Sequence, residues 1–220
     1  MAPRNSPART SVPRDSAGAA ERILRVAREQ LFARGYNALT MDALAHELGV
    51  SKKTLYAHFA SKDDIVAAVI DAAGDAIRSR VAAVLADRGL TFTGKLREVV
   101  AIVGAHWSRV TPSLLREFER FAPALHRRLE ELKQRNIPLV IGNLLRTGAA
   151  AGVVRKDIDP DFAVEFWLQS LNGLLAPATL ERLDLTPRGA FDKGVRLFFW
   201  AVLTDAGRAD LLSSEKGTST

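Results

Sequence analysis

Apolar residues at helical spacing run through almost the whole sequence, and this pattern limits the fold more than any other feature. Between residues 62 and 84 they form one stripe, which would cover about five turns of helix. Its members are Ile65, Val66, Val69, Ile70, Ala73, Ile77, Val81 and Val84. No segment alternates for long with the period of two that marks a half-buried strand. The sequence therefore predicts an all-α fold.

Capping residues and prolines divide this helical pattern into about nine helices. Glycines at 35 and 49 suit the left-handed conformation that ends a helix. Four residues can accept hydrogen bonds from the free N–H groups at the start of the helix that follows them: Thr40, Ser51, Asp159 and Thr186. Proline follows the last two, as is usual for a first helical residue. Pro123 would start another helix, and Pro138 would bend it.

The composition is that of a globular protein, with 220 residues of which 47% are hydrophobic. The chain contains no cysteine, which excludes disulfides, iron–sulfur clusters and cysteine nucleophiles and favours a cytoplasmic location. Residues 1–16 hold three arginines and three prolines without an apolar core, so they do not form a secretory signal. The longest uncharged run, 166–180, is too short and too polar to span a membrane. We expect neither export nor membrane insertion.

Positive charge is concentrated near the N-terminus. Residues 1–60 contain nine Lys and Arg against five Asp and Glu, whereas the remaining 160 contain 22 against 20. Because the position of the charge matters more than a net charge of only +6, this asymmetry predicts an N-terminal module that binds anions.

Residues 40–62 have the pattern of a helix-turn-helix, in which two short helices cross at a glycine-containing turn. Ala45 is small where the two helix axes must approach, and Gly49 allows the backbone conformation of the turn. Val50 would fill the corner, and Ser51 would cap the second helix. This segment predicts a DNA-binding unit.

The second helix of this unit separates an apolar face from a basic one. Leu55 and Phe59 would face the core, while the outer face carries no acid. Its members are Lys52, Lys53, Thr54, Tyr56 and His58. A helix that enters a major groove between two rows of phosphates needs such a face, and Lys62 would add a phosphate contact at the start of the next helix.

With these residues, the sequence resembles the tetracycline-repressor family of bacterial transcription regulators. The resemblance covers about 45 residues and is carried by Thr40, Leu44, Ala45, Gly49, Val50, Ser51, Thr54, Leu55, Tyr56, His58, Phe59, Ser61, Lys62 and Asp63. It implies that Lys52, Lys53 and Thr54 approach base edges or flanking phosphates. It also implies that Tyr56, His58, Lys62 and Thr40 hold the DNA backbone. Lys53 departs from the pattern, since many relatives have Gly, Ala or Pro there, and its long cation could reach a guanine or only a phosphate.

The resemblance also implies a division of the chain into an N-terminal three-helix DNA-binding domain and a larger helical ligand-binding and dimerisation domain. We expect a disordered basic arm at 1–16, the DNA-binding domain at 17–62, the larger domain at 63–208 and a flexible tail at 209–220. Proteins of this family act as homodimers on double-stranded DNA operators, and most take a small effector.

Two sets of residues in the larger domain are candidates for these roles. An effector pocket, suited to a small and mostly apolar molecule, would include Val103, His106, Trp107, Arg109, Glu117, Phe118 and Phe121. A dimer interface would include Phe162, Phe166, Trp167, Leu171, Leu174, Phe191, Val195, Phe198, Phe199 and Val202, on two helices that are apolar over most of their circumference. The alternative for the aromatic residues of both sets is that they fill the core of a single chain.

The sequence points to no metal, cofactor or catalytic group. His126 and Glu130 stand at i and i+4, but two ligands are too few for a metal ion. No nucleophile with a base, phosphate loop or dinucleotide fingerprint is found. The leading hypothesis is a ligand-released repressor that binds a palindromic operator as a homodimer. The alternatives are a constitutive architectural DNA-binding protein without effector, and a helical enzyme or interaction module with a vestigial helix-turn-helix.

Overall fold

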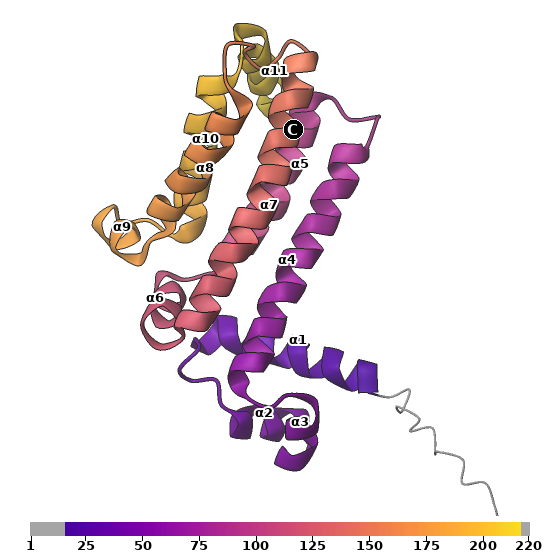
Figure 1. Ribbon diagram of the computed structural model, residues 1–220, viewed down its shortest axis with the longest axis vertical. Coiled ribbons are helices and arrows are strands. Elements are labelled where there is room, and N and C mark those ends of the chain that lie inside the picture. Colours follow the sequence, from indigo (N-terminus) through magenta and orange to yellow (C-terminus); the bar gives the residue numbers. More distant parts are fainter. Residues whose placement is uncertain (1–15, 217–220) are drawn as a thin grey trace, which may run out of the picture.

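The computed structural model describes residues 16–216, which form eleven α-helices and no strand (Figure 1). The helices are α1 Ser16–Arg34, α2 Met41–Leu48, α3 Lys52–His58, α4 Lys62–Ala86, α5 Phe92–Trp107, α6 Pro112–Phe121, α7 Pro123–Ala150, α8 Pro160–Leu175, α9 Pro177–Arg182, α10 Pro187–Val202 and α11 Asp205–Lys216. Within this range no helix is both long and apolar enough to cross a membrane. The predicted all-α fold is confirmed. The predicted basic arm lies outside the described residues except for Ser16, which begins α1.

Two helices were missed by the expectation of about nine. One is α9, whose six residues are too few to show a helical period. The other is α11, so the prediction of a flexible tail from residue 209 is wrong as far as Lys216. Thr204 caps the start of α11 by accepting a hydrogen bond from Gly207 N at 3.1 Å, and a tertiary contact holds its middle, where Thr93 Oγ1 donates to Asp210 Oδ2 at 2.7 Å. Residues 217–220 lie outside the described range.

The predicted helix starts and stops are confirmed by geometry. The side chains of Thr40, Ser51, Asp159 and Thr186 each accept hydrogen bonds from backbone N–H groups of the following turn. Gly35 and Gly49 have φ values of 84° and 67°, which side-chain-bearing residues rarely adopt. Pro123 begins α7, and this helix continues through Pro138, where the sequence predicts a bend.

The buried apolar residues form two clusters, and α4 belongs to both. The first cluster joins α1, α2 and α3 to Ile65, Val66, Val69 and Ile70 of α4 and to residues of α6 and α7. The second contains Val81 of α4 and residues of α5, α7, α8 and α10. The 25-residue helix α4 therefore connects the two clusters. The domain boundary predicted at residue 62 therefore falls at the start of a shared element.

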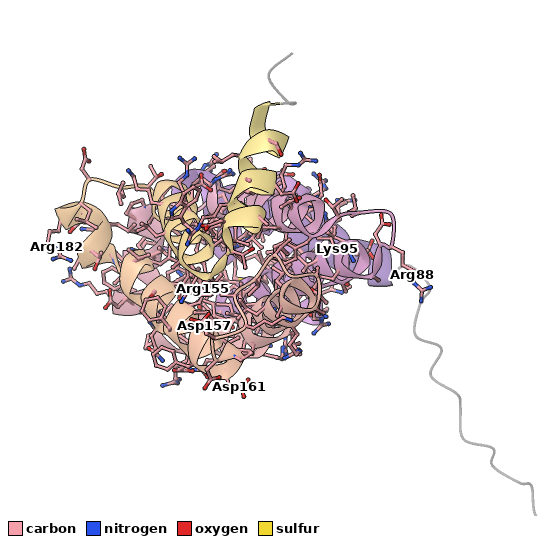
Figure 2. All side chains as sticks on the ribbon, turned by 90° about the horizontal axis from the view of Figure 1, so that it is seen from above. Arg88, Lys95, Arg155, Asp157, Asp161 and Arg182 are labelled. Carbon is pink, nitrogen blue, oxygen red and sulfur yellow. The ribbon has the colours of Figure 1, made fainter. Side chains whose placement is uncertain are left out.

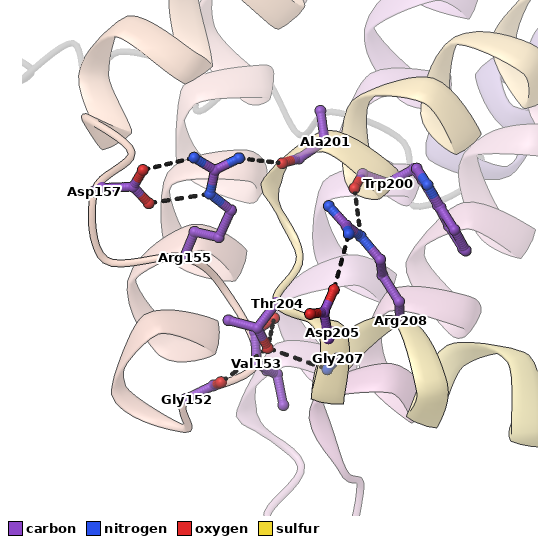
Figure 3. A network of polar contacts seen from close by, with 10 residues as sticks. All are labelled: Gly152, Val153, Arg155, Asp157, Trp200, Ala201, Thr204, Asp205, Gly207 and Arg208. Carbon is purple, nitrogen blue, oxygen red and sulfur yellow. Dashed lines mark hydrogen bonds and ion pairs between the residues drawn. The ribbon is translucent and has the colours of Figure 1, made fainter.

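A polar network closes the end of the molecule opposite to α2 and α3 (Figures 1 and 3). The loop between α7 and α8 pairs with the end of α10 through an antiparallel bridge from Val154 to Leu203. Arg155 donates to both carboxylate oxygens of Asp157 and to the carbonyl of Ala201. Thr204 donates to the carbonyls of Gly152 and Val153. These contacts hold α10 in place against α7 and α8.

Candidate nucleic-acid interface and ligand cavity

The helices α2 and α3 lie together at one end of the molecule (Figure 1). In the turn between them, Val50 N donates to the carbonyl of Ala45 at 3.0 Å. Arg22 of α1 donates to the carbonyl of Leu48 at 2.8 Å, which ties the turn to the first helix. Leu44, Leu48 and Leu55 are buried between the three helices. The apolar side of the motif is thereby fixed, and its other side faces solvent.

The exposed side of α3 carries most of the side chains predicted to contact DNA. Lys52, Lys53, Thr54 and Tyr56 are exposed, whereas His58 is partly buried. Ser51 Oγ accepts from Thr54 N at 3.1 Å and lies 2.9 Å from Thr54 Oγ1. The cap therefore also positions the hydroxyl of Thr54. Thr40 stands exposed beside this surface, and its own hydroxyl caps α2 by accepting from Ala43 N at 3.1 Å.

The basic surface contains one acid that the sequence did not reveal. Asp42 of α2 lies beside α3, and its Oδ1 is 2.6 Å from Lys52 Nζ. The hydrogen bond to Asp42 and its negative charge raise the pKa of Lys52. The α3 helix itself is free of acids, as predicted, but its neighbour supplies a carboxylate across the turn.

Lys62 makes contacts within the protein as well as standing near the predicted interface. Its ammonium lies 3.9 Å from the centre of the Tyr36 ring and donates to the carbonyl of Tyr36 at 3.3 Å. The Tyr36 hydroxyl donates to Asp63 Oδ1 at 2.6 Å. Burial, followed by the hydrogen bond to Asp63, raises the pKa of Tyr36 well above its usual range. Lys62 thus also holds the turn between α1 and α2, a role that sequence reasoning missed.

A cavity of about 450 Å³ lies behind the interface and is lined by residues of α1 and of α4 to α10. Its lining is mostly apolar, as is usual for sites that bind small organic molecules. Of the residues predicted for an effector pocket, Val103, His106, Trp107 and Phe118 line the cavity. The structure places the other three elsewhere.

Those three residues contact the DNA-binding region or solvent. The Arg109 guanidinium lies 4.6 Å from the centre of the Phe32 ring on α1. Glu117 of α6 accepts a hydrogen bond from Asn37 N at 2.8 Å, in the turn between α1 and α2. Phe121 is 53% exposed. Polarity and aromaticity marked all three as candidates, but side-chain direction depends on how α6 packs against α1.

The lining also contains polar residues outside the predicted set: Glu119, His126, Glu130, Lys133, Asn136 and Asn172. The side-chain oxygens of Asn136 on α7 and Asn172 on α8 are buried, and they have no hydrogen-bond partner within residues 16–216. Burial, followed by the charge of Arg109, lowers the pKa of His106. The lining therefore combines a large apolar surface with a few polar groups, among them the ion pair of Glu130 and Lys133.

The helices predicted to form a dimer interface divide into an inner and an outer side. Trp167, Leu171, Phe191, Phe198, Phe199 and Val202 are buried in the core of this single chain. Leu174 and Val195 are partly buried, and Phe162 and Phe166 are 70% and 55% exposed. Leu197 and Trp200, which were not predicted, are 75% and 45% exposed. The buried residues of this set pack against α5 and α7. The surface that remains free for a second copy is therefore narrower than predicted, and it also includes Leu197 and Trp200.

The far end of the molecule does not repeat the basic surface. Figure 2 looks onto this end, where the labelled side chains carry both signs of charge, among them Lys95, Arg155, Asp157 and Asp161. Arg155 is paired with Asp157, which lowers the pKa of that carboxyl.

On α7, Glu130 is paired with Lys133 at 2.5 Å, and no group of three or more potential metal ligands occurs among residues 16–216.

Comparisons with known proteins agree with this geometry. Residues 23–69 match the sequence model of the family described as Bacterial regulatory proteins, tetR family. The uncharacterized HTH-type transcriptional regulator YvaF of Bacillus subtilis (strain 168) is 22% identical over 185 residues, which are 84% of this chain and 96% of YvaF.

Two solved structures share the fold. The regulatory protein TetR from Rhodobacter sphaeroides has a TM-score of 0.64 at 21% identity, over 84% of this chain and 98% of that one. SmeT, the repressor of the Stenotrophomonas maltophilia multidrug efflux pump SmeDEF, has a TM-score of 0.59 at 17% identity, over 87% of this chain and 93% of that one. The exposed basic side of α3, the caps of its helix-turn-helix and the similarity to these regulators all indicate DNA binding. Residues 23–69 therefore carry the DNA-binding domain of the tetR family, and the chain is a DNA-binding transcriptional regulator.

Proposed function

We propose that this regulator is a ligand-released repressor that works in the cytoplasm and binds a palindromic operator as a homodimer. The observation that carries this proposal is the connection between the exposed face of α3 and an internal cavity. Residues of α1, α4 and α6 line that cavity, and the same three helices hold the DNA-binding region. SmeT, which shares the fold, is itself a repressor.

On the DNA side, Lys52, Lys53 and Thr54 would meet base edges or flanking phosphates, because they are exposed on the first turn of α3. Tyr56 and Thr40 would contact the DNA backbone from the two sides of this surface. His58 is less accessible, and Lys62 would have to share its ammonium between Tyr36 and a phosphate. These assignments predict strong dependence of binding on salt concentration, since phosphate contacts release counterions.

The homodimer would form through the outer sides of α8 and α10. Phe162 and Phe166 stand one turn apart on α8, and Leu197 and Trp200 stand one turn apart on α10. Large exposed apolar side chains that cluster on neighbouring helices are typical of interaction surfaces. A two-fold pair of such surfaces would set two copies of α3 on one face, which explains the preference for a palindrome.

Release would follow from contacts between the cavity wall and the DNA-binding region. Phe118 lines the cavity and packs edge to face against Tyr36, with 5.8 Å between ring centres. The residue before Phe118, Glu117, accepts a hydrogen bond from the backbone N–H of Asn37. A ligand that displaces α6 would therefore move the turn that leads into α2. To shift the population from 1:99 to 99:1 it must favour the released form by about 5.5 kcal/mol.

The test is to select bound sequences from a random DNA pool and then add a chemical library to the complex. We expect a palindromic site and at least one compound that releases it. A chain that binds its selected site but is released by no compound would instead be a constitutive DNA-binding protein. A chain that selects no sequence would refute the assignment of α3. The proposal assigns no catalytic reaction, in keeping with a family of regulators.

A further inference from the structure

The cavity is long rather than round. Its lining on α7 extends from His126 to Leu144, eighteen residues apart, which corresponds to about 27 Å along a helix that rises 1.5 Å per residue. A round cavity of the same volume would be only about 10 Å across, much less than the length of this lining. The lining also reaches from Leu31 on α1 to Trp167 on α8. An extended molecule fits this space better than a compact one.

The lining offers no free positive charge to an anion. Of the described lining residues, Lys133 is the only lysine or arginine, and its ammonium is 2.5 Å from Glu130 Oε1. Burial keeps the pKa of His106 low, so this imidazole is uncharged at neutral pH. A carboxylate ligand would therefore lose its hydration without gaining a free cation. The same pairing occupies Glu130, and the other carboxylate of the lining, Glu119, is exposed to solvent. A cationic ligand inside the cavity would therefore have to displace Lys133.

The amides of Asn136 and Asn172 supply the polar recognition that remains. Both side-chain oxygens are buried without a partner in the described chain, and a buried polar atom without a hydrogen bond is costly. Because the two ends of an amide are a donor and an acceptor, these side chains can satisfy an uncharged group that has both, such as a carboxamide or a hydroxyl. Asn136 belongs to α7 and Asn172 to α8, and both residues are part of the cavity lining.

On the basis of the proposed effector function, we infer that the effector of this regulator is an uncharged, elongated and mostly apolar molecule whose polar group hydrogen-bonds to Asn136 and Asn172. The apolar body lies along the α7 wall of the cavity. A free fatty acid or an alkyl amine of the same length is excluded by charge rather than by size.

The experiment uses three probes that differ only in their polar end: decanamide, decanoate and decylamine. Binding to the full-length protein at pH 7.5 is measured by titration calorimetry. It is also followed by tryptophan fluorescence, since Trp107 and Trp167 line the cavity. We expect decanamide to bind at least tenfold more tightly than either charged probe.

The variants Asn136→Leu and Asn172→Leu test the two amides, and Gln134→Leu, at an exposed position of α7, is the matched control. Each Asn variant should weaken decanamide binding about tenfold, as the loss of one neutral hydrogen bond allows. The melting temperature of the free protein should stay equal or rise in both, because an unpartnered buried polar group is removed. A merely structural asparagine would instead lower the melting temperature and leave the preference among probes unchanged.

The outcomes separate this inference from the proposed function. Tighter binding of decanoate or decylamine, or decanamide binding that is unchanged in both Asn variants, would overturn the inferred ligand class but leave the cavity as an effector site. If none of the three probes binds, the inferred ligand class is wrong, whereas the proposed effector function fails only if no compound of the chemical library releases the operator.

Discussion

Removing the carboxylate of Asp42 should strengthen DNA binding. In the structure Lys52 is paired with Asp42 at 2.6 Å, and both side chains are exposed at the predicted interface. When DNA approaches, either the pair persists and Lys52 contributes no net charge, or Lys52 turns to a phosphate and leaves Asp42 facing the same polyanion. The substitution Asp42→Asn removes the negative charge, so that Lys52 is free to pair with a phosphate and no carboxylate faces the DNA. It keeps a side chain of nearly the same shape.

The size of the effect follows from counterion release. One additional neutralised phosphate makes the slope of log affinity against log salt steeper by about 0.9. Between 50 and 200 mM salt, a fourfold change in concentration, the variant should therefore lose about 3.5-fold more affinity than the wild type. At both ends of this range it should bind more tightly than the wild type, and the difference should be larger at 50 mM than at 200 mM.

The measurement is fluorescence anisotropy with the selected operator and with random DNA at four salt concentrations. Asp205→Asn is the matched control, since it makes the same change of charge at the opposite end of the molecule, where Asp205 pairs with Arg208 (Figures 1 and 3). The control should keep the wild-type slope. Equal slopes for Asp42→Asn and wild type, or weaker binding by Asp42→Asn at 50 mM salt, would show that Asp42 and Lys52 do not face DNA phosphates.

Three further predictions concern the larger domain. Leu197→Arg should convert a dimer to monomers in sedimentation experiments, whereas Leu139→Arg, at a comparably exposed leucine of α7, should not; a wild type that is monomeric at micromolar concentration would refute the interface. Because the folded-state pKa of His106 lies below the unfolded value of 6.5, unfolded chains take up a proton first as pH falls. Urea unfolding should therefore show stability decreasing below pH 6.5 by up to about 1.4 kcal/mol per pH unit. His106→Gln should abolish that component, and an unchanged slope would contradict it. Val103→Trp should fill the cavity and prevent release by ligand without changing operator affinity, and Ala105→Trp, at an exposed neighbour, should leave both unchanged.

Much of the DNA-binding region could be predicted because its determinants are local. Thr40, Gly49 and Ser51 act on backbone groups within a few residues of themselves, so their spacing alone predicts two short helices and the turn between them. The exposed basic side of α3 follows from the same spacing, since Leu55 must be buried and its neighbours on the other side cannot be. The pairing of Lys52 with Asp42 could not be predicted, because it depends on the angle at which α2 and α3 cross.

The cavity and the dimer surface depended on tertiary structure. Apolar periodicity identified α8 and α10 as helices with apolar residues on most sides, but it could not tell that Trp167 faces the core while Phe166 faces solvent. Periodicity also could not tell which polar residues line the cavity. Glu117 was predicted to line it but holds the α1–α2 turn instead, and Asn136 was not predicted but lines the cavity. A helix repeats every 3.6 residues whatever surrounds it, so the sequence determined which residues share a side. Only the packing of eight helices around one space decided which side of each helix lines that space.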